Sequence, residues 1–170
     1  MTQLTPEELI ASGRDWFRRH RADYIASRGA KGHIISLEHD GGRPFATHCL
    51  LRTIGRNSGR AYINPLFYAI HGGEVVLMGS AAGSPRDPQW MNNLRAAEEV
   101  QVQIAGQAFR ATSRIAGGEE RQQVWDYVLT NHPAFATYQS RTDRPFPIAM
   151  LRTFEEIPVF TEADYDHDYP

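Results

Sequence analysis

The sequence has little that could hold a metal ion or form a disulfide. Cys49 is its single cysteine, so no disulfide can form within the chain. Neither CxxC nor HExxH occurs, and the seven histidines show no spacing typical of zinc ligands. We therefore predict no metal site and expect Cys49 to be a small core residue.

Basic residues are not in excess, and long apolar segments are missing. The net charge is -2 and the pI is near 6.4, which argues against a nucleic-acid partner. No apolar run approaches the roughly 20 residues of a membrane-spanning helix, and the start MTQLTPEEL has no signal-peptide pattern. We therefore expect a cytoplasmic protein with no transmembrane segment.

The common catalytic signatures are also missing. The chain has no GxSxG elbow, no SxxK, no P-loop and no GxGxxG after a strand. This pattern argues against a protein nucleophile and against a Rossmann unit.

Residues 1–30 predict an N-terminal amphipathic helix. Thr5-Pro6-Glu7-Glu8 has the spacing of a capping box with proline at the first helical position. Four arginines lie mostly off the apolar stripe. The stripe consists of Leu9, Ile10, Trp16, Phe17, Tyr24 and Ile25. Such a helix packs on the domain, covers a site as a lid, or lies on a membrane surface as a peripheral contact.

The middle of the chain indicates short antiparallel strands. Turn residues at 71–73 and 105–106 have hairpin length, and helical spacing recurs at 88–95 and 118–130. The strand-like runs are HIISL, THCLLRTI, AYINPLFYAI, EVVLMGS, VQVQIAG, QAFRATSRI and, last, PIAMLR. We predict a mainly β (α+β) fold in one domain, residues 1–170, with an antiparallel sheet or barrel and helices outside it. The acidic residues 161–170 predict a disordered tail.

Three loops combine small residues with polar or aromatic ones. GRNSGR at 55–60 suits either an ordinary turn or a site for an anion. Residues 79–83 suit either a flexible connection or a loop that presents N–H groups to an anion ahead of a helix near Pro88. The third is HPAFATYQSRTDRPFP, before the last strand.

A series of motifs recurs in a fixed order along residues 10 to 155. Its parts are GRxSG, NPL, a loop of Ser and small residues, DPxW and YQxRTDRxxP. Together they resemble the deazaflavin (coenzyme F420)-dependent nitroreductase family, which includes F420H2-dependent quinone reductases. The resemblance implies an FMN-binding-protein-like split β-barrel. It also implies an oxidoreductase that transfers a hydride from reduced F420 to a quinone, an enone or lactone, or a nitroaromatic.

The resemblance also implies site residues. Ser80 or Tyr138 would hydrogen-bond the acceptor oxygen, and Tyr138 or His132 would relay the proton. The residues implied in cofactor binding are Arg56, Asn57, Ser58, Tyr62, Ile63, Asn64, Pro65, Leu66, Phe67, Met78, Gly79, Ser80, Ala81, Gln89, Trp90, Met91, Asn92, Asn93 and Phe135. Arg60 is added to this set from its place in the GRNSGR turn.

The chain departs from the family pattern at several of these positions. The family usually has lysine where this chain has Asn57 and Ala81, often a basic residue at Tyr62, and tyrosines at His132 and Phe135. Two lost charge-assisted bonds would weaken phosphate binding on the order of a hundredfold unless other cations compensate. Arg60 and Arg86 are the nearby candidates.

Two other functions remain open at this point. The missing lysines suggest FMN as the cofactor of the same barrel. The aromatic-rich N-terminal helix and Phe135 suggest a non-enzymatic binder of an apolar ligand. A homodimer is a further hypothesis, because a split barrel leaves sheet edges that a second copy can cover.

Overall fold

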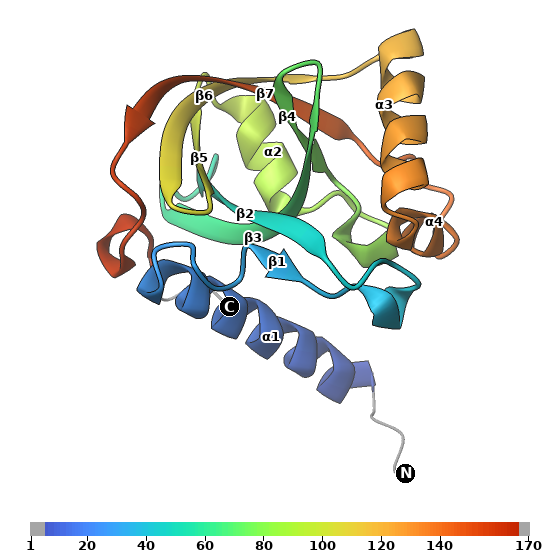
Figure 1. Ribbon diagram of the computed structural model, residues 1–170, viewed down its shortest axis with the longest axis horizontal. Helices are drawn as coiled ribbons and strands as arrows, with labels where there is room; N and C mark the ends of the chain where they lie inside the picture. Colours follow the sequence, from blue (N-terminus) through green and yellow to red (C-terminus); the bar gives the residue numbers. More distant parts are fainter. Residues whose placement is uncertain (1–5, 167–170) are drawn as a thin grey trace.

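Six antiparallel strands form a closed barrel in the computed structural model, which describes residues 6–166 and the side chains of 13–166 (Figure 1). The strands are β2 (Ala46–Ile54), β3 (Ala61–His71), β4 (Glu74–Met78), β5 (Val100–Ile104), β6 (Gln107–Ile115) and β7 (Ile148–Ile157). They pair in the order β2-β3-β4-β7-β6-β5, and β5 pairs back with β2. The short β1 (Ile34–Ile35) pairs with β2. The predicted antiparallel barrel is confirmed.

The two predicted hairpins join β3 to β4 and β5 to β6. Gly72 and Gly73 both have positive φ, 58° and 79°, as a two-residue turn between twisted strands requires. Ala105, with φ of 49°, begins the second turn.

α2 (Gln89–Ala96) closes one end of the barrel. Its Trp90, Met91 and Leu94 are buried in one cluster with interior strand residues such as Leu51 and Val102. Burial of a large apolar side chain contributes about 1.5–3 kcal/mol, so these three contacts fix the helix in place.

α3 (Gly118–Asn131) and α4 (Ala134–Gln139) cover the outside of the barrel on one side (Figure 1). Val124 and Val128 of α3 and Phe135 of α4 pack in one cluster with Met78 and Ile148. The sequence predicted α3 but no helix where α4 lies. A six-residue helix shows less than two turns of periodicity, so its stability comes from tertiary packing.

α1 (Pro6–Ala26) crosses the outside of the barrel beside β3 (Figure 1). The Tyr24 side chain is fully buried, and its hydroxyl donates to the His48 carbonyl at 3.0 Å and accepts from the Ala105 amide at 2.8 Å. Further toward the N-terminus, Trp16 and Phe17 are 39% and 48% exposed. The helix is thus anchored at its C-terminal end. Thr5 of the predicted capping box lies outside the described residues.

Residues 161–166 are folded, which differs from the predicted disordered tail. A short 3-10 helix, η3 (Glu162–Asp164), has a capping box at Thr161. Asp166 exchanges two hydrogen bonds with Ala61, and Tyr165 is buried. These contacts hold the segment in place although it is rich in acidic residues. Residues 167–170 lie outside the described part of the chain.

Candidate functional site

Two neighbouring cavities open where the barrel wall is incomplete. β3 pairs with β2 from Ala61 onward, but with β4 only from Tyr68, so residues 61–67 have one open edge. Pro65, which has no N–H to donate, is tolerated on such an edge. The larger cavity measures about 380 Å³ and the smaller about 330 Å³, and Asn64 and Trp90 line both. The two cavities therefore meet.

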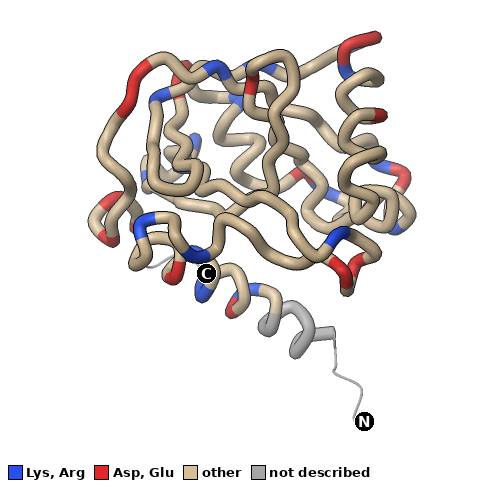
Figure 2. The backbone as a smooth tube through the Cα atoms, in the orientation of Figure 1, with Lys and Arg blue, Asp and Glu red and all other residues tan. Residues whose placement is uncertain are grey.

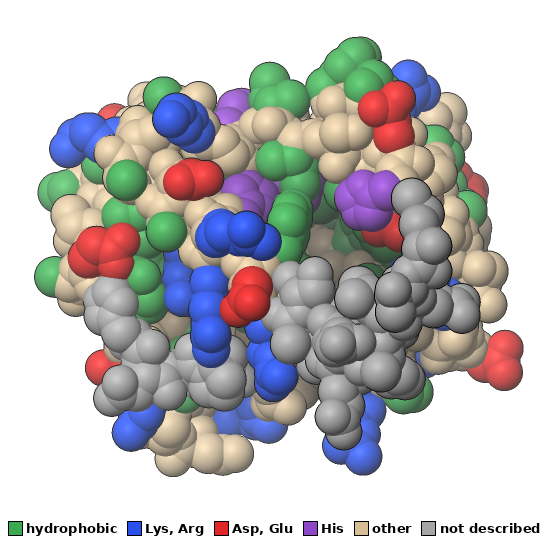
Figure 3. Space-filling view, turned by 90° about the horizontal axis from the view of Figure 1, so that it is seen from below, with side chains coloured by type: hydrophobic (Ala, Val, Ile, Leu, Met, Phe, Trp, Pro, Cys, Tyr) green, Lys and Arg blue, Asp and Glu red, His purple; other side chains and the backbone are tan. Residues whose placement is uncertain are grey.

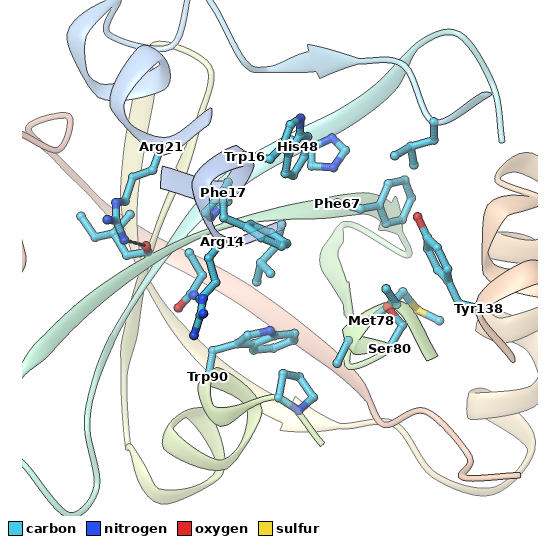
Figure 4. A pocket seen from close by; sticks show the side chains of 18 of the residues that line it. Arg14, Trp16, Phe17, Arg21, His48, Phe67, Met78, Ser80, Trp90 and Tyr138 are labelled. Atoms are coloured by element: carbon cyan, nitrogen blue, oxygen red, sulfur yellow. Dashed lines mark hydrogen bonds between the residues drawn. The ribbon is translucent and has the colours of Figure 1, made fainter. Parts of the chain in front are cut away.

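Six of the residues that line the larger cavity are Phe, Trp or Tyr (Figure 4). Phe67 comes from β3 and contacts Phe135 of α4 with ring centroids 4.9 Å apart; Phe135 in turn contacts Tyr138 at 5.5 Å. Trp16 and Phe17 of α1 line the same cavity. Interlocked rings of this kind form a rigid wall that suits a flat, apolar ligand.

The GRNSGR turn lines the smaller cavity. Arg56 donates from its backbone N–H and from Nη1 to Asn93 Oδ1, at 3.2 and 3.1 Å, and from Nη1 to Gln89 Oε1 at 3.0 Å. Because both acceptors are neutral amides, they orient the guanidinium without neutralising its charge. Ser58 Oγ lies 2.9 Å from Tyr62 Oη. A Cβ at Gly55 would collide with the Ser58 and Tyr62 side chains, so a larger residue there would displace both of them.

The cavities carry a one-sided charge. Four arginines line them, and no Asp or Glu occurs among their described lining residues. Three of these arginines come from α1, along which basic positions recur in Figure 2. Figure 3 shows Lys and Arg side chains gathered on the face of the molecule that α1 covers. Cavity walls of one sign attract ligands of the other, so this site suits an anion. The four are Arg14, Arg18, Arg21 and Arg56.

The loop after β4 has a strained backbone. Ala81, Ala82 and Gly83 all have positive φ, of 45°, 51° and 88°. For alanine this conformation costs of order 1 kcal/mol or more, and it persists only where the surroundings impose it. Such strain is common at binding sites, and Ser80, Ala81 and Ala82 line the larger cavity.

Two arginines of the YQSRTDRPFP motif hold this loop. Arg144 donates to the carbonyls of Gly79, Ser80 and Ser84 at 2.9–3.0 Å and to Asp87 Oδ1 at 2.6 Å. Arg141 donates to the Ala82 carbonyl at 3.0 Å. Neither arginine lines a cavity, so the motif shapes the loop rather than forming the cavity surface.

Tyr138 is the predicted catalytic residue with the clearest geometry. It lines the larger cavity, and its hydroxyl donates to Asp40 Oδ2 at 2.9 Å. Arg141 pairs with the other oxygen of Asp40 at 3.2 Å. Burial and the Asp40 carboxylate raise the pKa of Tyr138, so the phenol stays protonated at neutral pH. Ser80, predicted beside it, also lines the cavity.

The histidine that reaches the cavity is His48, not the predicted His132. His132 lies outside both cavities and packs against Phe67 with ring centroids 4.4 Å apart. His48 lines the larger cavity, and its Nδ1 lies 3.2 Å from the Ala46 carbonyl. Burial lowers the pKa of His48 to about 4, so the ring is neutral at pH 7. Nothing in the strand-like run THCLLRTI distinguished this residue.

Most of the predicted cofactor-binding residues line one or both cavities. Met91 is fully buried in the barrel, Asn92 accepts a hydrogen bond from Arg95, and neither lines a cavity. Arg60 and Gly79 also line neither cavity. The larger cavity holds Ile63, Asn64, Pro65, Leu66, Phe67, Met78, Ser80, Ala81, Trp90 and Phe135; the smaller holds Arg56, Asn57, Ser58, Tyr62, Asn64, Gln89, Trp90 and Asn93.

The lining residues that the sequence missed come mostly from α1. Two predictions pointed to the residues of α1: the lid alternative for the N-terminal helix, and the apolar-ligand alternative that named this aromatic-rich helix. The predicted compensating cations Arg60 and Arg86 line neither cavity. The missed residues are Arg14, Trp16, Phe17, Arg18, Arg21, Leu37, His48, Ala82 and Pro88.

A sequence model of the F420H(2)-dependent quinone reductases matches residues 16–153. The chain belongs to this family. A curated F420H(2)-dependent quinone reductase of Mycobacterium tuberculosis (strain ATCC 25618 / H37Rv) is 30% identical over 142 residues, which are 82% of this chain and 91% of the relative.

Two solved structures are similar in fold and sequence. An F420-H2 dependent reductase (FDR-A) has a TM-score of 0.56 and 31% identity, with 62% of this chain and 93% of that chain covered. A domain-swapped dimer has a TM-score of 0.58 and 28% identity, with 82% and 99% covered. The split barrel predicted from the resemblance is thereby confirmed.

Family membership makes the protein an oxidoreductase with reduced coenzyme F420 as hydride donor. It favours F420 over the alternatives of FMN and a non-enzymatic ligand. Among residues 6–166, no helix combines the length and hydropathy needed to cross a membrane. No cluster of metal-binding side chains occurs there either. The cytoplasmic location and the peripheral membrane contact stay predictions.

Proposed function

We propose that the protein reduces a quinone, with F420 in the two joined cavities and the quinone against the aromatic wall of the larger one. The observation that carries this proposal is the junction at Asn64 and Trp90, where an aromatic cavity meets one built on the GRNSGR turn. An anionic cofactor with a flat ring needs both environments next to each other. A quinone is likewise flat and apolar, with oxygens that accept hydrogen bonds.

The residues present fit F420. Arg56, Asn57 and Ser58, with Gln89 and Asn93 behind them, offer donors to a phosphate or to carboxylates, and no described acidic side chain lines the cavities to repel them. The edge of β3, Met78 and Trp90 would lie along the ring. When bound, reduced F420 supplies the hydride.

The chain itself orients the acceptor and stabilises developing charge. Tyr138 is oriented by Asp40, which is held in turn by Arg141. As negative charge develops on a quinone oxygen, the Tyr138 hydroxyl can turn from Asp40 and donate to it. Because the pKa of Tyr138 is raised, we assign the hydroxyl a hydrogen bond rather than full proton transfer. The aromatic wall limits the access of water, which strengthens that bond. The hydroquinone anion formed by hydride transfer would then take its proton from water as it leaves the cavity.

The test is a comparison of acceptors at a fixed concentration of reduced F420. Menadione, a cyclic enone and a nitroaromatic are supplied in parallel, and formation of oxidised F420 is followed by absorbance. We expect the largest kcat/KM with menadione. Faster turnover of either other acceptor contradicts the quinone assignment. If F420 binds tightly but no acceptor is reduced, the catalytic proposal fails.

A second copy of the chain is the other partner we propose. The solved relative that is a domain-swapped dimer supports it. So do two exposed apolar side chains: Ile34 in the edge strand β1, and Phe45 directly before β2, the strand that pairs with β1. Light scattering after size exclusion should give twice the chain mass for wild type. Phe45→Glu should shift the protein toward monomer, and a monomeric wild type contradicts the proposal.

A further inference from the structure

Three arginines of α1 face the site from outside the barrel. Arg14, Arg18 and Arg21 follow one another at spacings of four and three, which places them on one side of the helix. All three line the larger cavity, whereas Arg19 on the same helix lines neither. In the view of Figure 4, Arg14 is drawn next to Trp90, a residue that lines both cavities, and Arg21 is drawn next to β3.

The charges of Arg14 and Arg21 are not neutralised within the described residues. Arg21 donates to the Ile63 carbonyl at 3.1 Å and stacks on Tyr165 with its guanidinium carbon 4.4 Å from the ring centroid, and neither partner is an anion. The Nε of Arg21 is buried without a partner. No ion pair of Arg14 with a described acidic side chain occurs. Arg18, by contrast, lies 3.8 Å from Asp15.

The loops that wall the site contribute one cation themselves. GRNSGR places Arg56 in the smaller cavity, while its Arg60 lines neither. The strained loop from Ser80 to Gly83 has no charged side chain. A ligand with a phosphate and carboxylates needs more than one guanidinium to replace its water, because each charged group loses hydration on binding.

We infer that Arg14 is an anion-binding residue of the cofactor site and that α1 clamps the bound F420, with Arg21 adding to the positive potential. The inference rests on the proposed function, since it takes F420 as the anion. Arg14 lines the larger cavity from a part of α1 that is exposed, whereas Tyr24 anchors the other end of the helix. An exposed helix segment held at one end is of low local stability, so a bound anion can fix it.

A fluorescence titration with F420, without any acceptor, tests the contact. We expect Arg14→Ala to raise the Kd about ten- to a hundredfold, the range for loss of one hydrogen bond between charged groups. Arg19→Ala removes the same charge from the same helix, and we expect a Kd within about threefold of wild type. Arg14→Lys should restore part of the affinity. Arg14 is exposed, so we expect all three variants to fold.

The outcomes separate this inference from the proposed function. If wild type and Arg14→Ala bind F420 equally, the role of Arg14 is refuted while the function stands. If Arg14→Ala and Arg19→Ala weaken F420 binding equally, the loss reflects the overall positive charge of α1, and a direct contact between Arg14 and the cofactor is refuted. If wild type itself does not bind F420, the proposed function fails first.

Limited trypsin digestion gives a second readout that does not depend on turnover. Cleavage within α1 after Arg18 and Arg19 should slow when F420 saturates the wild type, because a clamped helix is a poor protease substrate. Arg19→Ala, followed at Arg18, should show the same protection. Arg14→Ala at saturating F420 should show less. Cleavage at equal rates with and without F420 in wild type refutes the clamp.

Discussion

Outside the barrel core, replacement of Arg144 should lower the free energy of unfolding more than replacement of most other residues. Its guanidinium is 14% exposed as a side chain and ties Gly79, Ser80, Ser84 and Asp87 together. Arg144→Ala would leave three carbonyls and a carboxylate without this donor, next to a backbone with three consecutive positive φ values. The loop would then lose the restraint that holds its strained conformation.

The magnitude follows from burial and from the partners that remain. Removal of one member of a buried charged pair costs about 3–5 kcal/mol. Asp87 is 23% exposed and keeps its 2.8 Å contact with Arg95, so we expect the lower end, about 3 kcal/mol. For a chain of this size each kcal/mol lowers Tm by about 2–4 °C, so we expect a fall of about 6–12 °C.

Thermal unfolding followed by circular dichroism measures this change. Arg152→Ala is the matched control: Arg152 is 75% exposed and its ion pair with Glu74 spans 3.7 Å, so its loss should move Tm by about 2 °C or less. Arg144→Lys should recover part of the loss, because one ammonium can still reach Asp87 but cannot serve all four acceptors. A Tm for Arg144→Ala equal to that of Arg152→Ala would refute the reasoning.

Three further outcomes are expected. Tyr138→Phe should lower kcat with menadione by about ten- to a hundredfold and leave the Kd for F420 nearly unchanged, which paired kinetics and titration would reveal. The pKa of His48 in the folded state is about 4, below its usual value, so as the pH falls below about 6.5 the unfolded state binds a proton before the folded state does. The free energy of unfolding should therefore drop by up to about 1.4 kcal/mol per pH unit. The urea midpoints at pH 7 and pH 5 should differ less in His48→Gln than in wild type. Gly83→Ala should destabilise the protein more than Gly59→Ala in the same urea assay. Both glycines have positive φ, but a methyl group at Gly83 would collide with Tyr138 and Arg141, whereas one at Gly59 would enter open space.

The barrel was predictable because its signals are local. Two-residue turns such as Gly72-Gly73 and alternating strands specify hairpins between neighbours in sequence. α4 was not predictable, because it is stabilised by the packing of Phe135 and Tyr138 on residues of β3 and β4, which are far away in sequence. The order around residues 161–166 also depends on a distant partner, the backbone of Ala61.

The site was predictable where one short segment forms a wall, as GRNSGR does. The parts of the site where walls from different elements come together were not predictable. Nothing in the order of residues places Arg14 beside Trp90 or replaces His132 by His48 in the cavity, because both depend on how α1 and β2 lie in space. The expectation that Arg60 or Arg86 would supply the missing charge assumed that nearness in sequence means nearness in space.

The involvement of α1 also connects the two halves of the proposed reaction. On α1, Arg14 lies two residues before Trp16 and three residues before Phe17, and all three line the larger cavity. If a bound anion fixes Arg14, it fixes the aromatic side chains beside it, because residues of one helical turn move together. Those side chains form part of the wall against which we place the quinone. Cofactor binding would therefore complete the acceptor cavity, so the quinone should bind better after F420 than before it.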